Sequence, residues 1–408
     1  MKIVHINNTD LTGARFNGHD IQVEFNKRGI SCKQFVVEKT GDDPNTISLL
    51  RDFEEPYLRN MCRLTEAEMS LHGVVYPYGW RLLQHQDFQE ADIAHYHLLH
   101  NHFISYAMFS ELTATKPSIL TIHDPWLFTG HCIYPIKCDK WEKEECKHCP
   151  HLIRNIPMKE DNAQYLWSLK KVIFASVNID LVVASKWMLD LVTRSPITAH
   201  FRNVHLIPFG IDTTMFDCKT RNKQAIRARL GIPQDHIVLF FRSDPSEFKG
   251  VSYIQEMLKL LRADNPITLL TVGQMGLVKP GSHNIVENGW INDENLMADF
   301  YAASDIFLMP SIAEAFGVMA IEAMASSLPI FVFEGTALPD VTFAPNCGIV
   351  LDNNDPKEFA NAVERLIKDQ NERIHRGTLG REIAVKHYDR KQHFDRLLEL
   401  YNEIIQRG

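Results

Sequence analysis

Short apolar runs alternate with amphipathic stretches along most of the chain. Each apolar run has the length of a buried strand, and most are followed by apolar residues at helical spacing. The runs that we expect as strands are residues 2–6, 35–37, 92–98, 118–122, 180–185, 205–212, 237–241, 269–273, 284–287, 306–309 and 331–333. Strands that alternate with helices predict an α/β protein with parallel sheets.

The stretch from residue 302 to 331 shows this alternation most clearly. An apolar strand ends at Pro310 and Ser311, and a helix follows Gly317 until Pro329 ends it. The residues at helical spacing in that helix are Val318, Ile321, Met324, Ala325 and Leu328. A strand, a turn and a helix therefore follow one another here.

The start of this helix is a candidate seat for an anion. The first backbone N–H groups, near Phe316 and Gly317, lack partners within the helix and present positive potential to a phosphate. Glu314 and Glu322 flank this turn. If the interval were helical, they would stand roughly 12 Å apart, too far to act as an acid/base pair on one glycosidic bond. We therefore expect each to accept hydroxyl groups at one end of an elongated ligand. The alternative is an amphipathic helix with two unrelated glutamates.

Two cations follow the predicted strand at residues 237–241. Arg242 and Lys249 leave the same strand end, where they would neutralise a pyrophosphate. The alternative is a pair of surface charges.

The amino-terminal half opens with a strand, a turn, a helix at about residues 15–27 and a second strand. This order predicts a Rossmann-like half, with Gly13 in the first turn as either a ligand-binding or a plain turn glycine. His95 and His97 alternate on one strand and so share a face. His123 directly follows the strand at residues 118–122, at the sheet edge where ligands collect in α/β proteins. The alternative is a turn in which His123 and Asp124 satisfy each other.

Four of the eight cysteines fall within one short segment, TGHCIYPIKCDKWEKEECKHCP. They are Cys132, Cys138, Cys146 and Cys149. Four thiolates at close range predict either a closed, structural zinc site or a set of free or pairing thiols.

Length and composition limit the classes of protein that the chain can belong to. The chain has 408 residues, of which 45% are hydrophobic, and this is enough for two domains. No apolar run is long enough to span a bilayer, so we expect a cytoplasmic protein. The net charge of −8 disfavours a general affinity for nucleic acid. Aromatic and basic residues mix between residues 51 and 81, which predicts either an ordinary solvated face or a surface for an acceptor or lipid.

Glu314 and Glu322, spaced as E-x7-E, together with the segment HDPWLFTGHC and the later CxxCP, carry a family resemblance. The chain resembles glycosyltransferase family 4, the retaining enzymes with the GT-B fold, over nearly its whole length. The cysteine segment resembles a subset that builds bacterial surface polysaccharides of the colanic acid, capsule or O-antigen type. The resemblance implies two Rossmann-like domains around a cleft. We expect an acceptor domain at residues 1–205, a nucleotide-sugar domain at 206–389, and a last helix at 390–408 that packs back on the first domain.

The same resemblance implies roles for individual residues. The expected catalytic residues are His123, Glu314 and Lys249, and the expected donor-binding residues are Arg242, Phe316, Gly317, Val318, Glu322 and Gly13. In the family the arginine usually stands closer to its lysine than Arg242 does to Lys249, so Lys249 is the firmer match.

The implied reaction moves a hexose-type sugar from a UDP- or GDP-sugar donor to a glycan or lipid-linked acceptor, with retention of configuration. It requires no cofactor, although a structural zinc is compatible with it, and lipid-linked acceptors imply a peripheral membrane contact. The alternatives are another GT-B enzyme, such as an epimerase or a phosphorylase, and a nucleotide-sugar binding subunit without catalysis.

Overall fold

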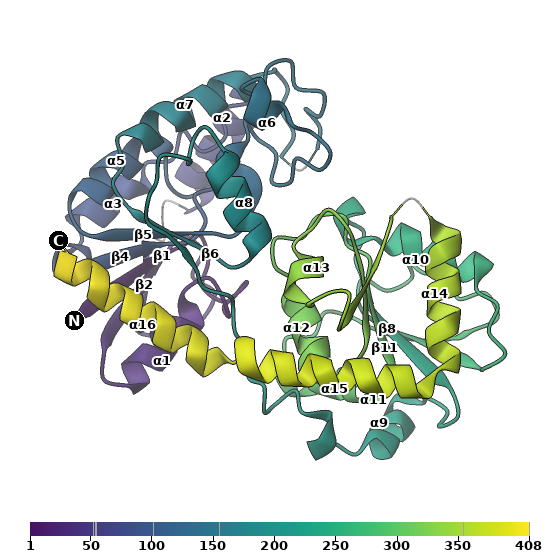
Figure 1. Cartoon of the computed structure of the whole chain (residues 1–408). Coiled ribbons are helices and arrows are strands. Elements are labelled where there is room, and N and C mark those ends of the chain that lie inside the picture. Colours follow the sequence, from purple (N-terminus) through teal and green to yellow (C-terminus); the bar gives the residue numbers. More distant parts are fainter. Residues whose placement is uncertain (52, 54, 101, 155, 354, 408) are drawn as a thin grey trace. The chain divides into compact units, whose positions relative to one another are not determined.

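A computed structural model describes residues 1–51, 53, 55–100, 102–154, 156–353 and 355–407. The chain forms two compact units, each with one parallel sheet (Figure 1). Unit 1 comprises residues 1–207 and 394–408, and unit 2 comprises residues 208–393.

The sheet of unit 1 has seven parallel strands in the order β3-β2-β1-β4-β5-β6-β7. Their bounds are β1 Lys2–Ile6, β2 Ser31–Val36, β3 Thr46–Ser48, β4 Ile93–Tyr96, β5 Ser118–Ile122, β6 Asp180–Val183 and β7 Val204–Leu206. The α-helices of this part of the chain are α1 His19–Lys27, α2 Asn60–Met69, α3 Tyr78–Gln84, α4 Gln86–Gln89, α5 Tyr106–Ala114, α6 Lys140–Lys143, α7 Ala163–Ala175 and α8 Lys186–Arg194. A π-helix, η1 Glu55–Arg59, precedes α2, and a 3-10 helix, η2 Pro125–Phe128, follows β5.

The sheet of unit 2 has six parallel strands in the order β10-β9-β8-β11-β12-β13. Their bounds are β8 Ile237–Ser243, β9 Ile267–Gly273, β10 Asn284–Asn288, β11 Ile306–Met309, β12 Ile330–Phe333 and β13 Gly348–Leu351. Its helices are η3 Cys218–Thr220, α9 Lys223–Leu230, η4 Glu247–Lys249, α10 Val251–Leu260, α11 Glu294–Ala303, α12 Val318–Ala325, α13 Leu338–Val341, α14 Pro356–Lys368 and α15 Gln370–His387. The last helix, α16 Arg390–Arg407, starts in unit 2, and its residues from Phe394 onward belong to unit 1.

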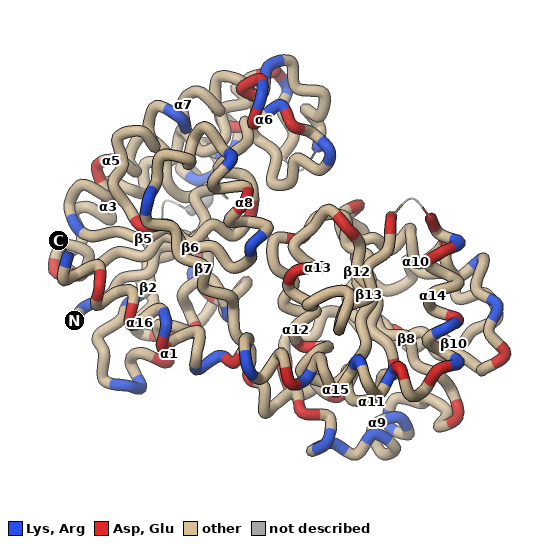
Figure 2. The backbone as a smooth tube through the Cα atoms, in the orientation of Figure 1, with Lys and Arg blue, Asp and Glu red and all other residues tan. Residues whose placement is uncertain are grey.

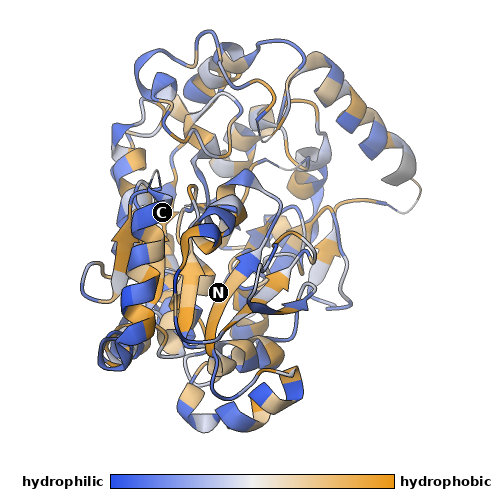
Figure 3. Ribbon diagram, turned by 90° about the vertical axis from the view of Figure 1, so that its right-hand side faces the viewer, coloured by the Kyte–Doolittle hydropathy of each residue, from blue (hydrophilic) through white to orange (hydrophobic). Residues whose placement is uncertain are grey.

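Apolar strands and helix faces form a core in each unit, and Figure 3 colours the strands mainly as hydrophobic. Strands buried on both faces read as continuous apolar runs in a parallel sheet, and so they could be located from the sequence. In unit 1, α16 contributes Phe394, Leu397, Leu400, Tyr401 and Ile404 to the core beneath β1 and β4. None of the described helices is both long enough and apolar enough to cross a bilayer.

Several predicted boundaries were wrong, and β2, for example, begins at Ser31 rather than at Phe35. The first helix begins at His19 rather than at about Arg15, because Gly13 and Gly18 have φ angles of 75° and 100° and interrupt any earlier helix. The strand expected at residues 205–212 ends at Leu206 as β7, and Pro208 has no N–H to extend the ladder.

Candidate active site

Two loops of unit 2 lie side by side at one edge of its sheet. β8 and β11 are paired and parallel, so the loops that follow them leave from the same edge. The N–H of Ile312 donates to the carbonyl of Phe248 across these loops at 2.9 Å. Gly250 has a φ of 76°, and a Cβ at this position would lie 1.9 Å from the carbonyl oxygen of Pro310. The close approach of the two loops therefore requires glycine at residue 250.

This approach brings Lys249 and Glu314 together. The Lys249 Nζ donates to Glu314 Oε2 at 2.7 Å, and the two side chains are only 24% and 13% exposed. The sequence had suggested both residues for the site, one from each loop, but gave no sign that they pair. The ion pair fixes an ammonium group and a carboxylate at one place on the sheet edge.

The start of α12 lies at the end of the Glu314 loop. Gly317 precedes the helix with a φ of 95°, and no side chain caps the helix there. Phe316 is buried, with its ring 5.2 Å from that of Phe209 and 5.7 Å from that of Tyr388. Its side chain therefore serves the core. What Phe316, Gly317 and Val318 offer to a ligand is their main chain.

The two glutamates of the E-x7-E spacing lie in different surroundings. Glu314 stands in the loop before Gly317, whereas Glu322 lies inside α12 and is 1% exposed. The hydroxyl of Tyr301 donates to Glu322 Oε2 at 2.8 Å. The interval is therefore only partly helical, and the structure places the second carboxylate inside the unit.

Arg242 does not join the Lys249 pair. Its guanidinium donates to Asp244 Oδ2 and lies over the ring of Trp290, 4.6 Å from the ring centre. Trp290 is 64% exposed, so this stacked arginine stands at the surface of unit 2.

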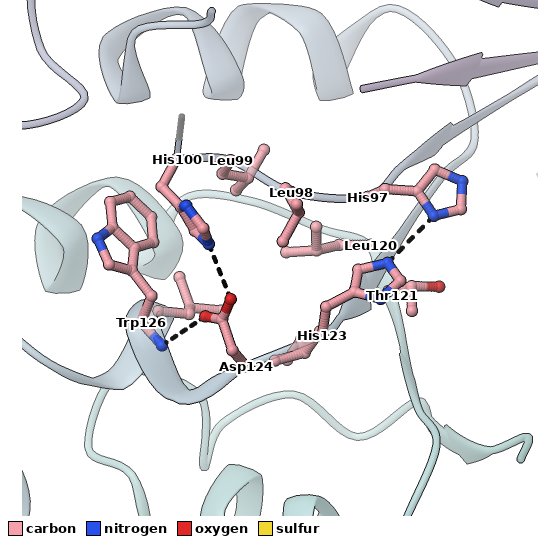
Figure 4. Close-up of a pocket in the computed structure, with 11 residues that line it drawn as sticks. His97, Leu98, Leu99, His100, Leu120, Thr121, His123, Asp124 and Trp126 are labelled. Carbon is pink, nitrogen blue, oxygen red and sulfur yellow. Dashed lines mark hydrogen bonds and ion pairs between the residues drawn. The ribbon is translucent and has the colours of Figure 1, made fainter. Parts of the chain in front are cut away.

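A second group of polar residues lines a pocket of unit 1, at the carboxyl ends of β4 and β5 (Figure 4). His123 Nε2 lies 3.2 Å from His97 Nδ1. Asp124 points the other way, toward His100, with Oδ2 2.8 Å from His100 Nε2. Asp124 and His123 thus each have another close partner, and the charge of His123 also helps to lower the pKa of Asp124.

Burial alone would raise the pKa of Asp124. The positive potential of His100, its hydrogen bond, and the N–H of Trp126 outweigh burial and lower the pKa. Asp124 therefore remains an acceptor that fixes the turn after β5.

His123 ends a chain of histidines that runs into the core. His97 Nε2 lies 2.9 Å from His5 Nδ1, and His95 contacts Tyr401 and Thr121 at 2.6 and 2.7 Å. Burial lowers the pKa of His5 to about 3, so this ring is neutral. His5 was not among the residues predicted from the sequence. The available signal was its position within the first apolar strand. In the structure this strand pairs with β4, and His5 lies opposite His95.

Gly13 stands against the ring of Phe16. A Cβ on this residue would lie 2.9 Å from the ring of Phe16, and that ring lies 5.8 Å from the ring of His123. The small residue at position 13 therefore lets Phe16 pack near His123.

The cysteines of the predicted metal cluster also come together in unit 1. Cys132, Cys138, Cys146 and Cys149 line a single hollow beside His131. All eight cysteines of the chain are described, and all are free.

Two parallel α/β sheets with these crossovers define the GT-B fold. Residues 235–369 match the model of the family described as Glycosyl transferases group 1. This segment contains Lys249, Glu314 and the whole of α12.

Solved structures share the fold over the whole chain. A sucrose-phosphate synthase from Thermosynechococcus elongatus matches with a TM-score of 0.69 and 17% identity, covering 100% of both chains. HepE from Anabaena, in complex with UDP-glucose, matches with a TM-score of 0.67 and 14% identity, covering 99% of this chain and 100% of that one.

A curated relative is similar over part of the chain. The D-inositol 3-phosphate glycosyltransferase of Arthrobacter sp. (strain FB24) is 26% identical over 200 residues, which cover 46% of each protein. The chain spans about half the length of the first curated relatives that it matches.

Proposed function

We propose that this protein is a retaining glycosyltransferase. It moves a hexose-type sugar from a UDP- or GDP-sugar to a glycan or lipid-linked acceptor in the synthesis of a cell-surface polysaccharide. Residues 206–389 bind the donor, residues 1–205 bind the acceptor, and the last helix, residues 390–408, completes the first domain.

The observation that carries the proposal is the Lys249–Glu314 pair beside the uncapped start of α12. An ammonium group and a helix N-terminus together favour a diphosphate. A carboxylate at 2.7 Å from that ammonium is placed to accept hydroxyl groups of the attached sugar. Both residues fall within the segment that matches the group 1 glycosyl transferases.

In the proposed reaction, the bond between the anomeric carbon and the donor phosphate breaks as the acceptor oxygen attacks from the same face. The departing phosphate takes the proton of the acceptor hydroxyl. Lys249, with Arg242 and the main chain of residues 316–318, stabilises the charge on the leaving group, and this is the main contribution of the protein. His123 contacts the sugar near the reacting carbon, and Glu322 binds the hydroxyls of the ribose. Gly13 lies in the first loop, which approaches the donor phosphates. The transfer itself uses no cofactor.

The similarity to HepE, whose structure was solved with UDP-glucose, supports a UDP-sugar as the first donor to test. UDP- and GDP-sugars should therefore be screened by thermal shift, since a ligand that binds only the folded state raises the melting temperature. The best donor then serves the activity test.

Lys249→Ala tests the proposal. Because it removes a charge that faces the leaving group, we expect transfer to fall by at least about 100-fold. Lys259→Ala is the matched control, since Lys259 lies on α10 and forms an exposed ion pair with Glu256. Product analysis by NMR measures both the rate and the anomeric configuration. Unchanged turnover of Lys249→Ala, with both variants folded, would refute the assigned role.

The same assay separates the alternatives. An epimerase consumes the donor without an acceptor, a phosphorylase requires phosphate and no nucleotide, and a binding subunit shifts the melting temperature without turnover.

A further inference from the structure

The loop that contains the four clustered cysteines is long and poorly supplied with apolar residues. It occupies residues 129–162, between η2 and α7, and α6 is the one helix in its described part. Acidic and basic residues alternate along it (Figure 2). Loops of this length without much secondary structure need another source of order.

The backbone of this loop is also strained. Ile136, Glu145, Cys146 and His148 all have positive φ, and they are half of the eight non-glycine residues with this conformation in the described chain. Each such residue costs on the order of 1–2 kcal/mol. An interaction that holds the loop must offset this cost.

The four thiols come together in one part of the loop. Cys132 Sγ and Cys149 Sγ both lie beside Nε2 of His131. All four line the same hollow, although they come from positions up to 17 residues apart, from 132 to 149. Cys146 and Cys149 add the C-x2-C spacing that is typical of zinc sites.

The spacing around His131 fits a metal-thiolate cluster. Its Nε2 lies 3.3 Å from Cys149 Sγ and 3.7 Å from Cys132 Sγ, so two of the sulfurs come close to one point. Cys132 and Cys149 thus present their sulfurs to the same ring nitrogen, although they are far apart in the loop.

Hydrogen-bond donors lie beside the thiols. A zinc ion with four thiolates has a net charge of −2, which such donors stabilise. The N–H of Gly130 donates to Cys146 Sγ at 3.2 Å. His131 has Nδ1 at 3.1 Å from the carbonyl of Ile156 and Nε2 at 3.3 Å from Cys149 Sγ. Donors to ligating atoms of this kind orient and stabilise metal ligands.

We propose that Cys132, Cys138, Cys146 and Cys149 hold one structural zinc ion, with His131 beside it. Four sulfurs leave no open position, so the ion does not take part in the transfer reaction. The zinc holds the loop against the turn after β5. Thr129 Oγ1 donates to the carbonyl of Cys132 at 2.6 Å, and Lys170 Nζ donates to the carbonyls of Trp126 and Thr129 at 2.7 and 2.8 Å. The site thus positions the turn that carries His123.

The test uses the full chain, purified under reducing conditions without chelator. Elemental analysis should find about one zinc per chain, and X-ray absorption at the zinc edge should find four sulfur ligands at about 2.3 Å. Less than about 0.1 zinc per chain after growth in zinc-supplemented medium would overturn the proposal, as would a spectrum with nitrogen or oxygen ligands. Disulfides between these cysteines in the fresh protein would overturn it as well.

Variants locate the site independently. Cys146→Ser with Cys149→Ser should reduce bound zinc at least tenfold, whereas Cys218→Ser, in the half-exposed 3-10 helix of unit 2, should leave it unchanged. If the double variant is insoluble, zinc release from the wild-type chain by a mercurial reagent is the second measurement. Release should follow modification of four thiols, and zinc release without thiol modification would contradict the assignment. Neither outcome depends on which sugar the protein transfers.

Discussion

Single residues of the proposed donor site could be nominated from the sequence, but their contacts could not. Lys249 and Glu314 were recognisable because each follows an apolar strand in an α/β pattern. Their ion pair depends on how far two loops lean together, which is set by the carbonyl of Pro310 against Gly250. The direction of the Arg242 side chain was likewise not predictable. It contacts Asp244, two residues away in the sequence, and also Trp290, which is far away in the sequence.

His5 gives a pH dependence that the sequence does not suggest. Burial lowers the pKa of this ring to about 3 in the folded state, against about 6.5 when unfolded. The unfolded chain therefore binds a proton that the folded chain does not, and stability is lost as the pH falls from about 6.5 toward 3. Between pH 6.5 and 4.5 the loss for this group is about 2 kcal/mol.

We expect His5→Gln to flatten this pH slope in unit 1. Hydrogen exchange of peptides from β1 and β4 measures it, because it reports the opening of this unit by itself. His375→Gln, on an exposed position of α15, is the control and should keep the slope of the wild type. An unchanged slope in His5→Gln would show that other groups carry the pH dependence.

At the scale of elements, the existence of strands was predicted better than the residues at which strands and helices begin and end. Parallel strands buried on both faces form apolar runs that are visible in one dimension. Helix starts and loop shapes depend on contacts that are not local, as the delayed start of α1 after Gly18 shows. The convergence of the cysteines was predictable from their spacing, whereas the donors around them were not.

A substitution at Gly250, which joins η4 to α10, tests how closely these elements approach the loop after β11. Gly250→Ala would place a Cβ against the Pro310 carbonyl at positive φ. We expect a loss of about 2–4 kcal/mol in the free energy of unfolding of unit 2, together with weaker donor binding as Lys249 shifts. Gly231→Ala is matched, since its φ is 70° but no atom lies within 4 Å of its Cβ. It should cost only about 1 kcal/mol and leave donor binding intact. Equal costs in the two variants would argue against the close approach.

The segment around α2 is a second test at this scale. Tyr57, Met61 and Leu64 follow one another at helical spacing and are 78%, 59% and 65% exposed. If the acceptor is lipid-linked, these side chains insert among lipid headgroups. We expect Met61→Ser with Leu64→Ser to reduce pelleting with anionic liposomes several-fold. Met275→Ser, which alters an equally exposed methionine of unit 2, should not. Pelleting that is absent in the wild type would remove the membrane contact from the proposal.

For the whole molecule, the fold class was predictable because the order of elements suffices for it. The number of strands was not, since β3 has only three residues and the four residues of β13, GIVL, were not recognised as a strand. The packing of α16 on unit 1 could be anticipated only through the family resemblance. The sequence of an amphipathic helix does not indicate which of two cores the helix packs against.

Removal of residues 394–408 tests this last connection. The five α16 side chains in the core of unit 1 are each at most 5% exposed. At about 1.5–3 kcal/mol each, their loss approaches the whole stability of a domain. We expect unit 1 to unfold, as judged by hydrogen exchange, while a donor still raises the melting temperature of unit 2. Removal of residues 406–408 alone keeps these five side chains and is the control. A folded unit 1 in the longer deletion would contradict the role of α16.

The position of α16 in the chain also bears on synthesis at the ribosome. Nascent domains usually fold in the order in which they emerge. Here the earlier part of the chain must wait, since all of residues 208–393 are translated before its final helix appears. At elongation rates of about 5–20 residues per second this delay is on the order of tens of seconds, during which the core of β1 and β4 lacks the side chains of α16. We therefore expect unit 2 to complete its fold first, and the opening segment, although made first, to be open to chaperones until α16 has emerged.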